Sequence, residues 1–118
     1  MSYVEGFILA VPKDRLDDYR AMARKAGAMW MGFGATSYVE CLGDDVPYGE
    51  LTSFPRAVLA TDDEVIVFSW ITYADRETRD AVMAKVMADD ALKDDPMPFD
   101  GKRMIFGGFV PFVDLRQT

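Results

Sequence analysis

The sequence lacks histidine and asparagine altogether and has a single cysteine, Cys41. Histidine is the usual general base of hydrolases and a common haem and zinc ligand. Its absence therefore excludes Ser-His-Asp and Cys-His catalytic groups and imidazole ligation of haem. One thiol excludes an internal disulfide and, without histidine, an ordinary zinc site. Any chemistry must use carboxylates, Lys, Arg, Tyr, Ser, Thr or the thiol, and we expect no cofactor.

Positive charge is also scarce, because 13 Lys and Arg stand against 20 Asp and Glu, which gives a net charge of -7. An acidic chain repels phosphate backbones and anionic lipids, which argues against nucleic acid and membrane surfaces as partners. No apolar run reaches the roughly 18 residues of a membrane span, and the first residues lack the basic start of a signal peptide. With the unpaired Cys41, these features predict a cytoplasmic protein.

The hydrophobic residues that are present predict one domain over residues 1–118. Apolar patterns favour strands at 3–11, 35–42, 64–73 and from Lys102 onward, and helical spacing favours helices at 13–33 and 75–89. The first and third strands are apolar at both odd and even positions, which is typical of central strands. Two strand-helix-strand halves of this kind predict an α+β fold, a ferredoxin-like βαββαβ sandwich with both helices on one face of an antiparallel sheet.

Two stretches depart from this regular pattern. Residues 43–63 are too long for an ordinary connection, so we expect an irregular insertion. Within it, residues 53–60 could extend or pair a strand, which Pro55 would confine to an edge or a bulge. The pair Gly107-Gly108 lies inside the aromatic last strand. Because glycine weakens a strand, the pair predicts a bulge or a point where a helix, a ligand or a second chain approaches the backbone closely.

The number of helices also predicts an assembly. Two helices cover one face of a four-stranded sheet, yet Phe68 and Trp70, or else the apolar residues of the opposite parity in the same strand, must lie on the other. A large exposed apolar patch usually marks an interface, so we expect a homodimer formed through the helix-free face.

Four blocks of sequence resemble a known family: residues 3–7, 40–47, 62–70 and 97–109 are similar to the YbaA-like bacterial proteins, domain of unknown function 1428. The resemblance implies a dimeric α+β barrel built from two ferredoxin-like subunits, and it implies no established reaction. Related barrels include oxygenases, isomerases and ligand-binding modules. Their ligands lie between sheet and helices or beside the insertion.

The polar residues expected near that space form the candidate ligand site: Glu40, Arg56, Trp70, Lys102 and Arg103. The cations would hold a carboxylate or phenolate, the carboxylate would move a proton, and the indole would stack on an aromatic ligand. The structural alternative is that Arg56 and Arg103 pair with Glu40 and Asp44 and so attach the insertion to the sheet.

Two weaker patterns occur beside this site. Three carboxylates at Glu40, Asp44 and Asp45 suggest a divalent cation, but a solvated acidic loop is commoner and we predict no metal. Cys41 has no cationic neighbour in sequence, which favours a core role over a reactive one. The sequence thus supports a small dimeric protein that binds or converts a small aromatic or anionic molecule. The alternative is a non-enzymatic dimeric interaction or stress-linked protein.

Overall fold

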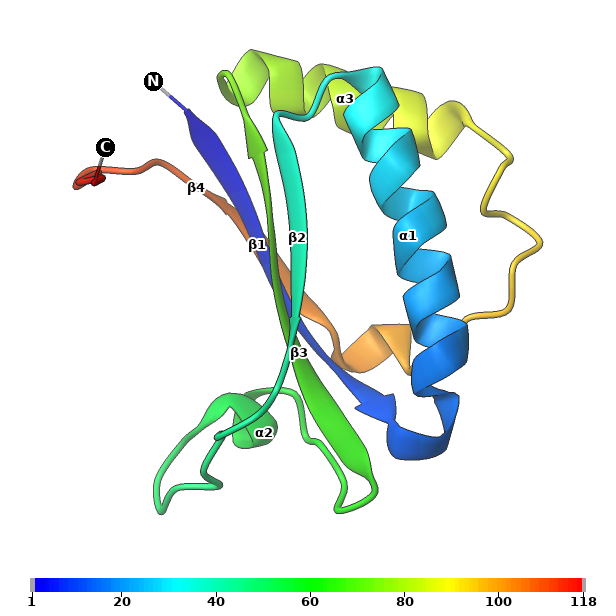
Figure 1. The fold of residues 1–118 in the computed structure, drawn as a ribbon, viewed down its shortest axis with the longest axis vertical. Coiled ribbons are helices and arrows are strands. Elements are labelled where there is room, and N and C mark those ends of the chain that lie inside the picture. Colours follow the sequence, from blue (N-terminus) through cyan, green and yellow to red (C-terminus); the bar gives the residue numbers. More distant parts are fainter. Residues whose placement is uncertain (1, 118) are drawn as a thin grey trace.

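A four-stranded antiparallel sheet with two long helices against one face makes up most of the computed structural model, which describes residues 2–117 (Figure 1). The elements in chain order are β1 (Tyr3–Pro12), η1 (Lys13–Arg15), α1 (Leu16–Phe33), β2 (Ser37–Leu42), α2 (Phe54–Ala57), β3 (Glu64–Tyr73), α3 (Arg76–Ala88), η2 (Gly101–Arg103) and β4 (Ile105–Phe109). The α+β fold class is confirmed. No helix within residues 2–117 combines the length and apolar character needed to span a membrane.

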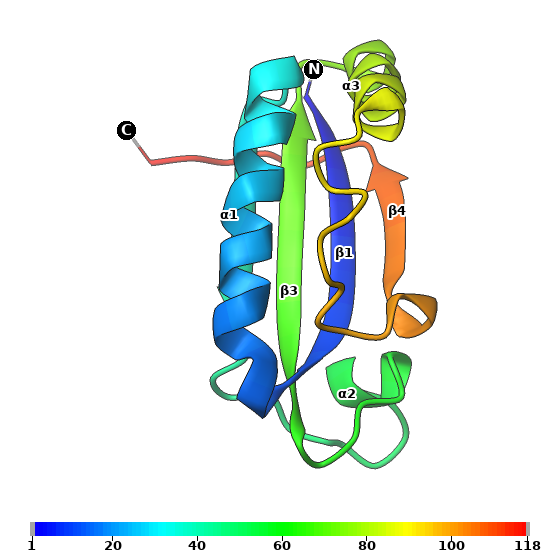
Figure 2. The ribbon, with the colours of Figure 1, turned by 90° about the vertical axis from the view of Figure 1, so that its right-hand side faces the viewer.

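The sheet has the strand order β2-β3-β1-β4, so β1 and β3 are the central pair, as the sequence predicted. They pair along their whole length, from Tyr3 opposite Tyr73 to Pro12 opposite Glu64. Odd-numbered residues of both strands face α1 and α3 and form two core clusters, one around Leu9 and the other around Tyr73. Figure 2 shows the helices in front of this face, with residues 89–100 crossing between α3 and η2.

The helix ends follow local sequence signals. α1 stops at Gly34, which has a φ of +129° and donates its backbone N–H to the carbonyls of Trp30 and Met31. α3 begins after Asp75, whose carboxylate accepts the backbone N–H of Thr78. Val82 is the buried residue of α3, whereas Met87, which helical spacing would place on the apolar stripe, is 79% exposed.

The insertion contains a helix where a strand was predicted. Ser53 caps the first turn by accepting the backbone N–H of Arg56, and Pro55 lies inside that turn, where its missing N–H is not needed. Val58 then packs on Ala10 and Ile66, on the sheet face opposite α1 and α3. The strand predicted at 53–60 is therefore wrong, since Pro55 and Ser53 together favour a helix start.

The last strand is shorter than predicted. Gly101–Arg103 forms the 3-10 turn η2, in which Asp100 accepts the backbone N–H of Lys102, so β4 begins at Ile105. The register from Val4 opposite Phe109 to Ile8 opposite Ile105 is continuous, so the predicted bulge at Gly107-Gly108 is wrong. A close approach does occur at Gly108, where an added Cβ would lie 2.2 Å from the Tyr3 hydroxyl, but the approaching group is a side chain of the adjacent strand β1 and not the predicted helix, ligand or second chain.

Candidate functional site

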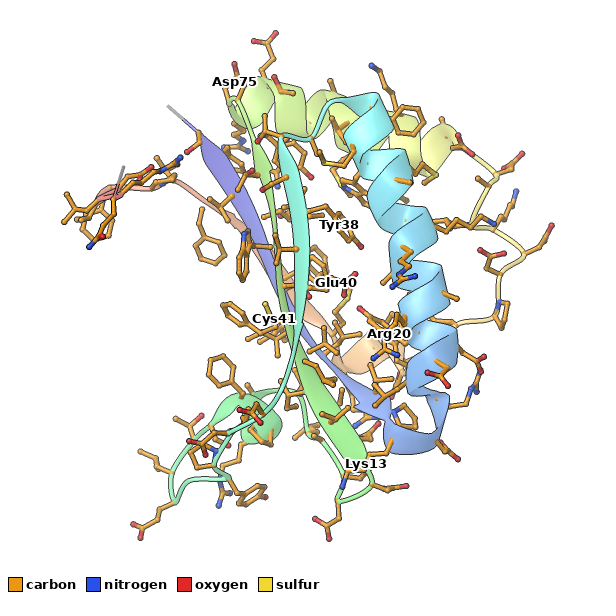
Figure 3. The ribbon with its side chains drawn as sticks, in the orientation of Figure 1. Lys13, Arg20, Tyr38, Glu40, Cys41 and Asp75 are labelled. Atoms are coloured by element: carbon orange, nitrogen blue, oxygen red, sulfur yellow. The ribbon has the colours of Figure 1, made fainter. Side chains whose placement is uncertain are left out.

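Glu40 lies in the middle of β2 and points toward α1, together with Tyr38 two residues earlier, while Cys41 points to the opposite face (Figure 3). Tyr38 donates to Oε2 of Glu40 at 2.7 Å. Tyr19 of α1 donates to Oε1, and Ser69 of β3, the residue paired with Glu40 in the sheet, donates to the same oxygen at 3.2 Å. Three hydroxyl groups from three elements therefore hold one carboxylate.

The surroundings keep these hydroxyls protonated. Burial, followed by the hydrogen bond and charge of Glu40, raises the pKa of Tyr19 well above its usual range. Burial and the same carboxylate also raise the pKa of Tyr38. Both tyrosines therefore remain donors at neutral pH. Within residues 2–117, the hydrogen-bond partners of Glu40 are hydroxyl groups, and no Lys or Arg pairs with it.

A cavity of about 430 Å³ opens between α1 and β2 beside this carboxylate. Arg20 and Arg24 line it from the helix and Tyr38 and Glu40 from the strand. A second space of about 110 Å³ adjoins it and shares Arg20 and Glu40. The helix side also carries the small residues Ala23, Gly27 and Ala28, and at Gly27 an added Cβ would lie only 2.9 Å from the Tyr38 ring.

The five residues predicted as a ligand site do not converge on this cavity. Glu40 borders it, whereas Trp70 lies on the opposite face of the sheet, in the apolar groove beside Phe68. Lys102 is exposed in η2. Of the five predicted residues, Glu40 lines this cavity and the other four do not.

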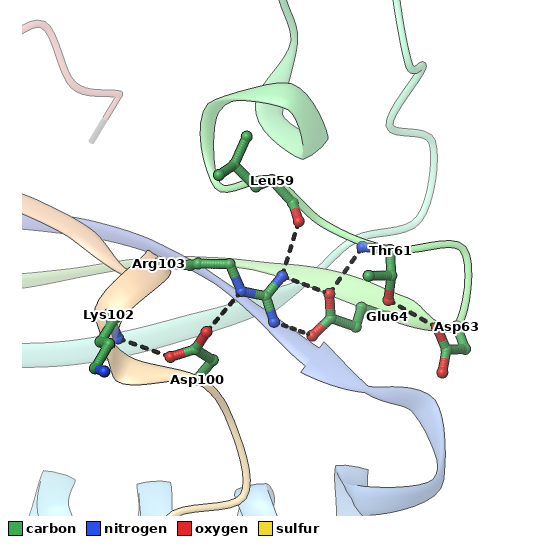
Figure 4. Close-up of polar contacts among 7 residues, drawn as sticks. All are labelled: Leu59, Thr61, Asp63, Glu64, Asp100, Lys102 and Arg103. Atoms are coloured by element: carbon green, nitrogen blue, oxygen red, sulfur yellow. Dashed lines mark hydrogen bonds and ion pairs between the residues drawn. The ribbon is translucent and has the colours of Figure 1, made fainter.

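Arg103 binds protein groups at the end of the sheet next to the insertion (Figure 4). Its two terminal nitrogens donate to the two carboxylate oxygens of Glu64 at 2.8 and 2.7 Å. The same guanidinium donates to Asp100 at 3.0 Å and to the Leu59 carbonyl at 2.8 Å. Arg103 thus joins η2, β3 and the insertion.

Arg56 is engaged within the insertion. It donates to the backbone carbonyls of Tyr48 and Gly49, at 3.0 Å each, and its guanidinium lies 3.9 Å from the centre of the Tyr48 ring. The attachment of the insertion to the sheet that was foreseen for both arginines is therefore made by Arg103, through Leu59 and Glu64, whereas Arg56 forms its hydrogen bonds within the insertion itself. Glu40 and Asp44 are not their partners.

The acidic end of β2 forms a separate, smaller space of about 290 Å³ that Cys41, Asp44 and Asp45 line together with Phe54 and Phe68. In residues 2–117 no three His, Cys, Asp or Glu side chains are grouped as metal ligands.

Sequence reasoning missed Tyr19, Tyr38, Ser69, Arg20 and Arg24 as site residues. The alternation Tyr38-x-Glu40 was the available signal, because it places a donor and an acceptor on one face of a strand. The contribution of Tyr19 had no local signal. That residue fitted the apolar stripe of its helix and is 21 positions away from Glu40.

Known proteins match the chain over nearly its whole length. Residues 2–101 match the family described as "Protein of unknown function (DUF1428)". The "Uncharacterized protein YbaA" of Escherichia coli (strain K12) is 51% identical over 116 residues, which cover 97% of this chain and 99% of that protein. The protein of the same name from Shigella flexneri has the same identity and coverage. These matches, together with the four sequence blocks, show that the chain belongs to the DUF1428 family.

Proposed function

We propose that this protein is a cytoplasmic homodimer of ferredoxin-like subunits, assembled as a dimeric α+β barrel, whose subunits each bind a small organic molecule between α1 and β2. Glu40 is the residue around which the ligand site is built. The supporting observation is its carboxylate, held by three hydroxyls and bordering a cavity of about 430 Å³.

A structural role alone explains this arrangement poorly. A partly buried carboxylate without a cation keeps much of its desolvation cost, and an apolar residue of similar size would cost less. Strands β2 and β3 are already paired along Ser37–Leu42, so the Ser69 contact is not needed to join them. Charged groups kept at such a cost, next to a cavity, are typical of binding and catalytic sites.

The binding role is tested by titrating the isotope-labelled protein with a chemically diverse fragment library and following backbone amide signals by NMR. We expect some fragments to shift the signals of Ala23, Gly27, Tyr38 and Glu40, and we expect Glu40→Gln to weaken those fragments at least tenfold. The matched control is Glu50→Gln, since Glu50 is exposed in the insertion. A library in which no compound moves the cavity signals would contradict the binding role.

The homodimer is supported by the sheet face opposite α1 and α3, here called the open face. Its apolar residues include Phe68, Ile105 and Phe109, which are 45%, 43% and 61% exposed in a single chain. Residues 110–117 leave the end of β4 and project away from this face (Figure 1). An apolar groove of about 720 Å³ is lined by the open face and by the first residues of this segment. Within that segment Phe112 and Leu115 are 95% and 90% exposed.

Contact with a second copy of the chain would stabilise the open face relative to its exposure to water. An apolar surface of this extent is costly in water, and a two-fold axis would place the same surface on both partners. Residues 112–117 of the projecting segment are exposed in the single chain, so we place the segment across the partner. The strand order β4-β1-β3-β2 supports the ferredoxin-like subunit. A partly exposed free Cys41 fits a reducing compartment such as the cytoplasm.

Light scattering behind a sizing column is expected to give about twice the chain mass of 13.2 kDa at micromolar concentration. Phe68→Glu should produce monomers, because it places a charge in the middle of the buried interface. Met87→Glu is the matched control, since Met87 is exposed on α3, away from the open face. A wild-type monomer under these conditions would refute the homodimer and favour a different protein as the partner of the open face.

A further inference from the structure

We infer that the ligand of the α1–β2 cavity is a small hydroxy-aromatic acid, with a phenolic hydroxyl that donates to Glu40 and an acidic group that binds Arg20 and Arg24. The inference rests on the proposed binding role and adds the chemical class of the ligand. It follows from the different chemistry of the two sides of the cavity, because the strand side favours a hydrogen-bond donor and the helix side favours an anion.

On the strand side, the site demands a hydrogen-bond donor. An ionised carboxylate offers about four acceptor positions and no donor. Tyr19 and Ser69 occupy Oε1, while Tyr38 alone donates to Oε2, so an acceptor position is left on Oε2. A second anion placed here would be repelled, whereas a hydroxyl would be bound.

On the helix side, the site demands an anion. Arg20 and Arg24 are one helical turn apart and both line the cavity. Arg24 makes no hydrogen bond or ion pair with any other residue of 2–117. Arg20 pairs with Asp17 at 3.2 Å, but their side chains are 58% and 99% exposed, and such a surface pair contributes little. The two guanidinium groups are therefore available to a carboxylate, which they can grip with paired hydrogen bonds, and they disfavour an amine.

The cavity also has apolar lining. Ala23, Gly27 and Ala28 on the helix and the Tyr38 ring on the strand provide it. A space of about 430 Å³ has room for one or two rings. In the proposed arrangement a flat ring lies beside the Tyr38 ring, with its hydroxyl toward Glu40 and its acidic group toward the arginines.

The test is a matched series of probes on the unmodified protein, followed by NMR titration of the cavity signals. The series contains 3- and 4-hydroxybenzoate, 4-methoxybenzoate and methyl 4-hydroxybenzoate. We expect at least one hydroxybenzoate to bind at least tenfold more tightly than both the ether, which lacks the donor, and the ester, which lacks the anion.

Two variants assign the ends. Glu40→Gln is expected to abolish the preference for hydroxyl over methoxy and to keep the preference for acid over ester. Arg24→Gln is expected to abolish the preference for acid over ester and to keep the preference for hydroxyl over methoxy. Because Arg24 is exposed, this variant should fold normally. Arg76→Gln, on the exposed side of α3, should change neither preference.

The possible failures are distinguishable. If neutral or cationic library fragments shift the cavity signals while the acid, ether and ester bind equally or not at all, the ligand class is wrong and the binding role stands. If no compound of any class shifts these signals, the binding role fails and the ligand class with it.

Discussion

Gly108→Ala is expected to destabilise the protein by about 3 kcal/mol, because overpacking a closed site forces side chains or backbone to move. The added Cβ would lie 2.2 Å from the Tyr3 hydroxyl and 2.8 Å from two atoms of its ring. For a domain of this size that loss lowers the melting temperature by about 10 °C. Urea unfolding monitored by tryptophan fluorescence measures it directly.

The clash cannot be relieved easily, because Tyr3 is fixed from several sides. Its side chain is 7% exposed and belongs to the core cluster around Tyr73. The Arg79 guanidinium lies 4.9 Å from the centre of its ring and is itself held by Glu5 at 3.0 and 3.2 Å. A shift of Tyr3 would therefore disturb a nearly buried ion pair between β1 and α3.

The neighbouring glycine supplies the control. At Gly107 an added Cβ would come no closer than 3.5 Å to the Phe109 ring, which is ordinary contact, so Gly107→Ala should cost less than about 1 kcal/mol. Tyr3→Phe removes the atom at 2.2 Å, so combining it with Gly108→Ala should recover part of the loss. If Gly108→Ala were as stable as the wild type, Tyr3 could move away from Gly108 without cost and the predicted clash would be refuted.

This pair of glycines illustrates what could be predicted from sequence. Their place inside an aromatic strand indicated a close approach, but the sequence identified neither the Tyr3 side chain as the approaching group nor Gly108 as the glycine concerned. Their difference depends on the register of β4 against β1, which turns Gly108 toward Tyr3 and Gly107 toward the open face. The central position of β1 and β3 was predictable for the opposite reason, since apolar residues at both parities are a property of the strand itself.

The candidate site was less predictable because it is assembled from distant parts. Glu40 was singled out from sequence, yet its partners depend on which face of α1 meets β2 and on the pairing of β2 with β3. The cations expected to accompany it were chosen because Arg56 lies in the insertion and Lys102 and Arg103 stand at the start of the predicted last strand. Arg103 instead pairs with Glu64, 39 positions away in the sequence. Arg20 and Arg24, which line the cavity, lie on the polar side of an amphipathic helix, and such a pattern is typical of a solvated surface.

The other large effect is expected at Arg103, where Arg103→Met should destabilise the protein by about 3 kcal/mol at pH 7. The Glu64 side chain is 5% exposed, and its two oxygens receive the guanidinium at 2.8 and 2.7 Å. Removing the cation leaves this carboxylate nearly buried and without its charge partner. Arg15→Met is the control, since Arg15 pairs with Asp18 at the surface and should lose less than about 1 kcal/mol.

The pH dependence of the same variant identifies the cause. The hydrogen bonds from Arg103, the largest contribution, lower the pKa of Glu64 from 4.5 to about 2 in the folded protein. A depressed folded-state pKa adds stability that is complete above the unfolded value and is lost as the pH falls from about 4.5 toward 2. The wild-type protein should therefore lose stability more steeply across this range than Arg103→Met, and the two should converge near its lower end. If the stabilities of the two proteins changed in parallel with pH, Glu64 would not be the group responsible. If Arg103→Met changed the binding of cavity ligands, Arg103 would have the binding role first considered for it.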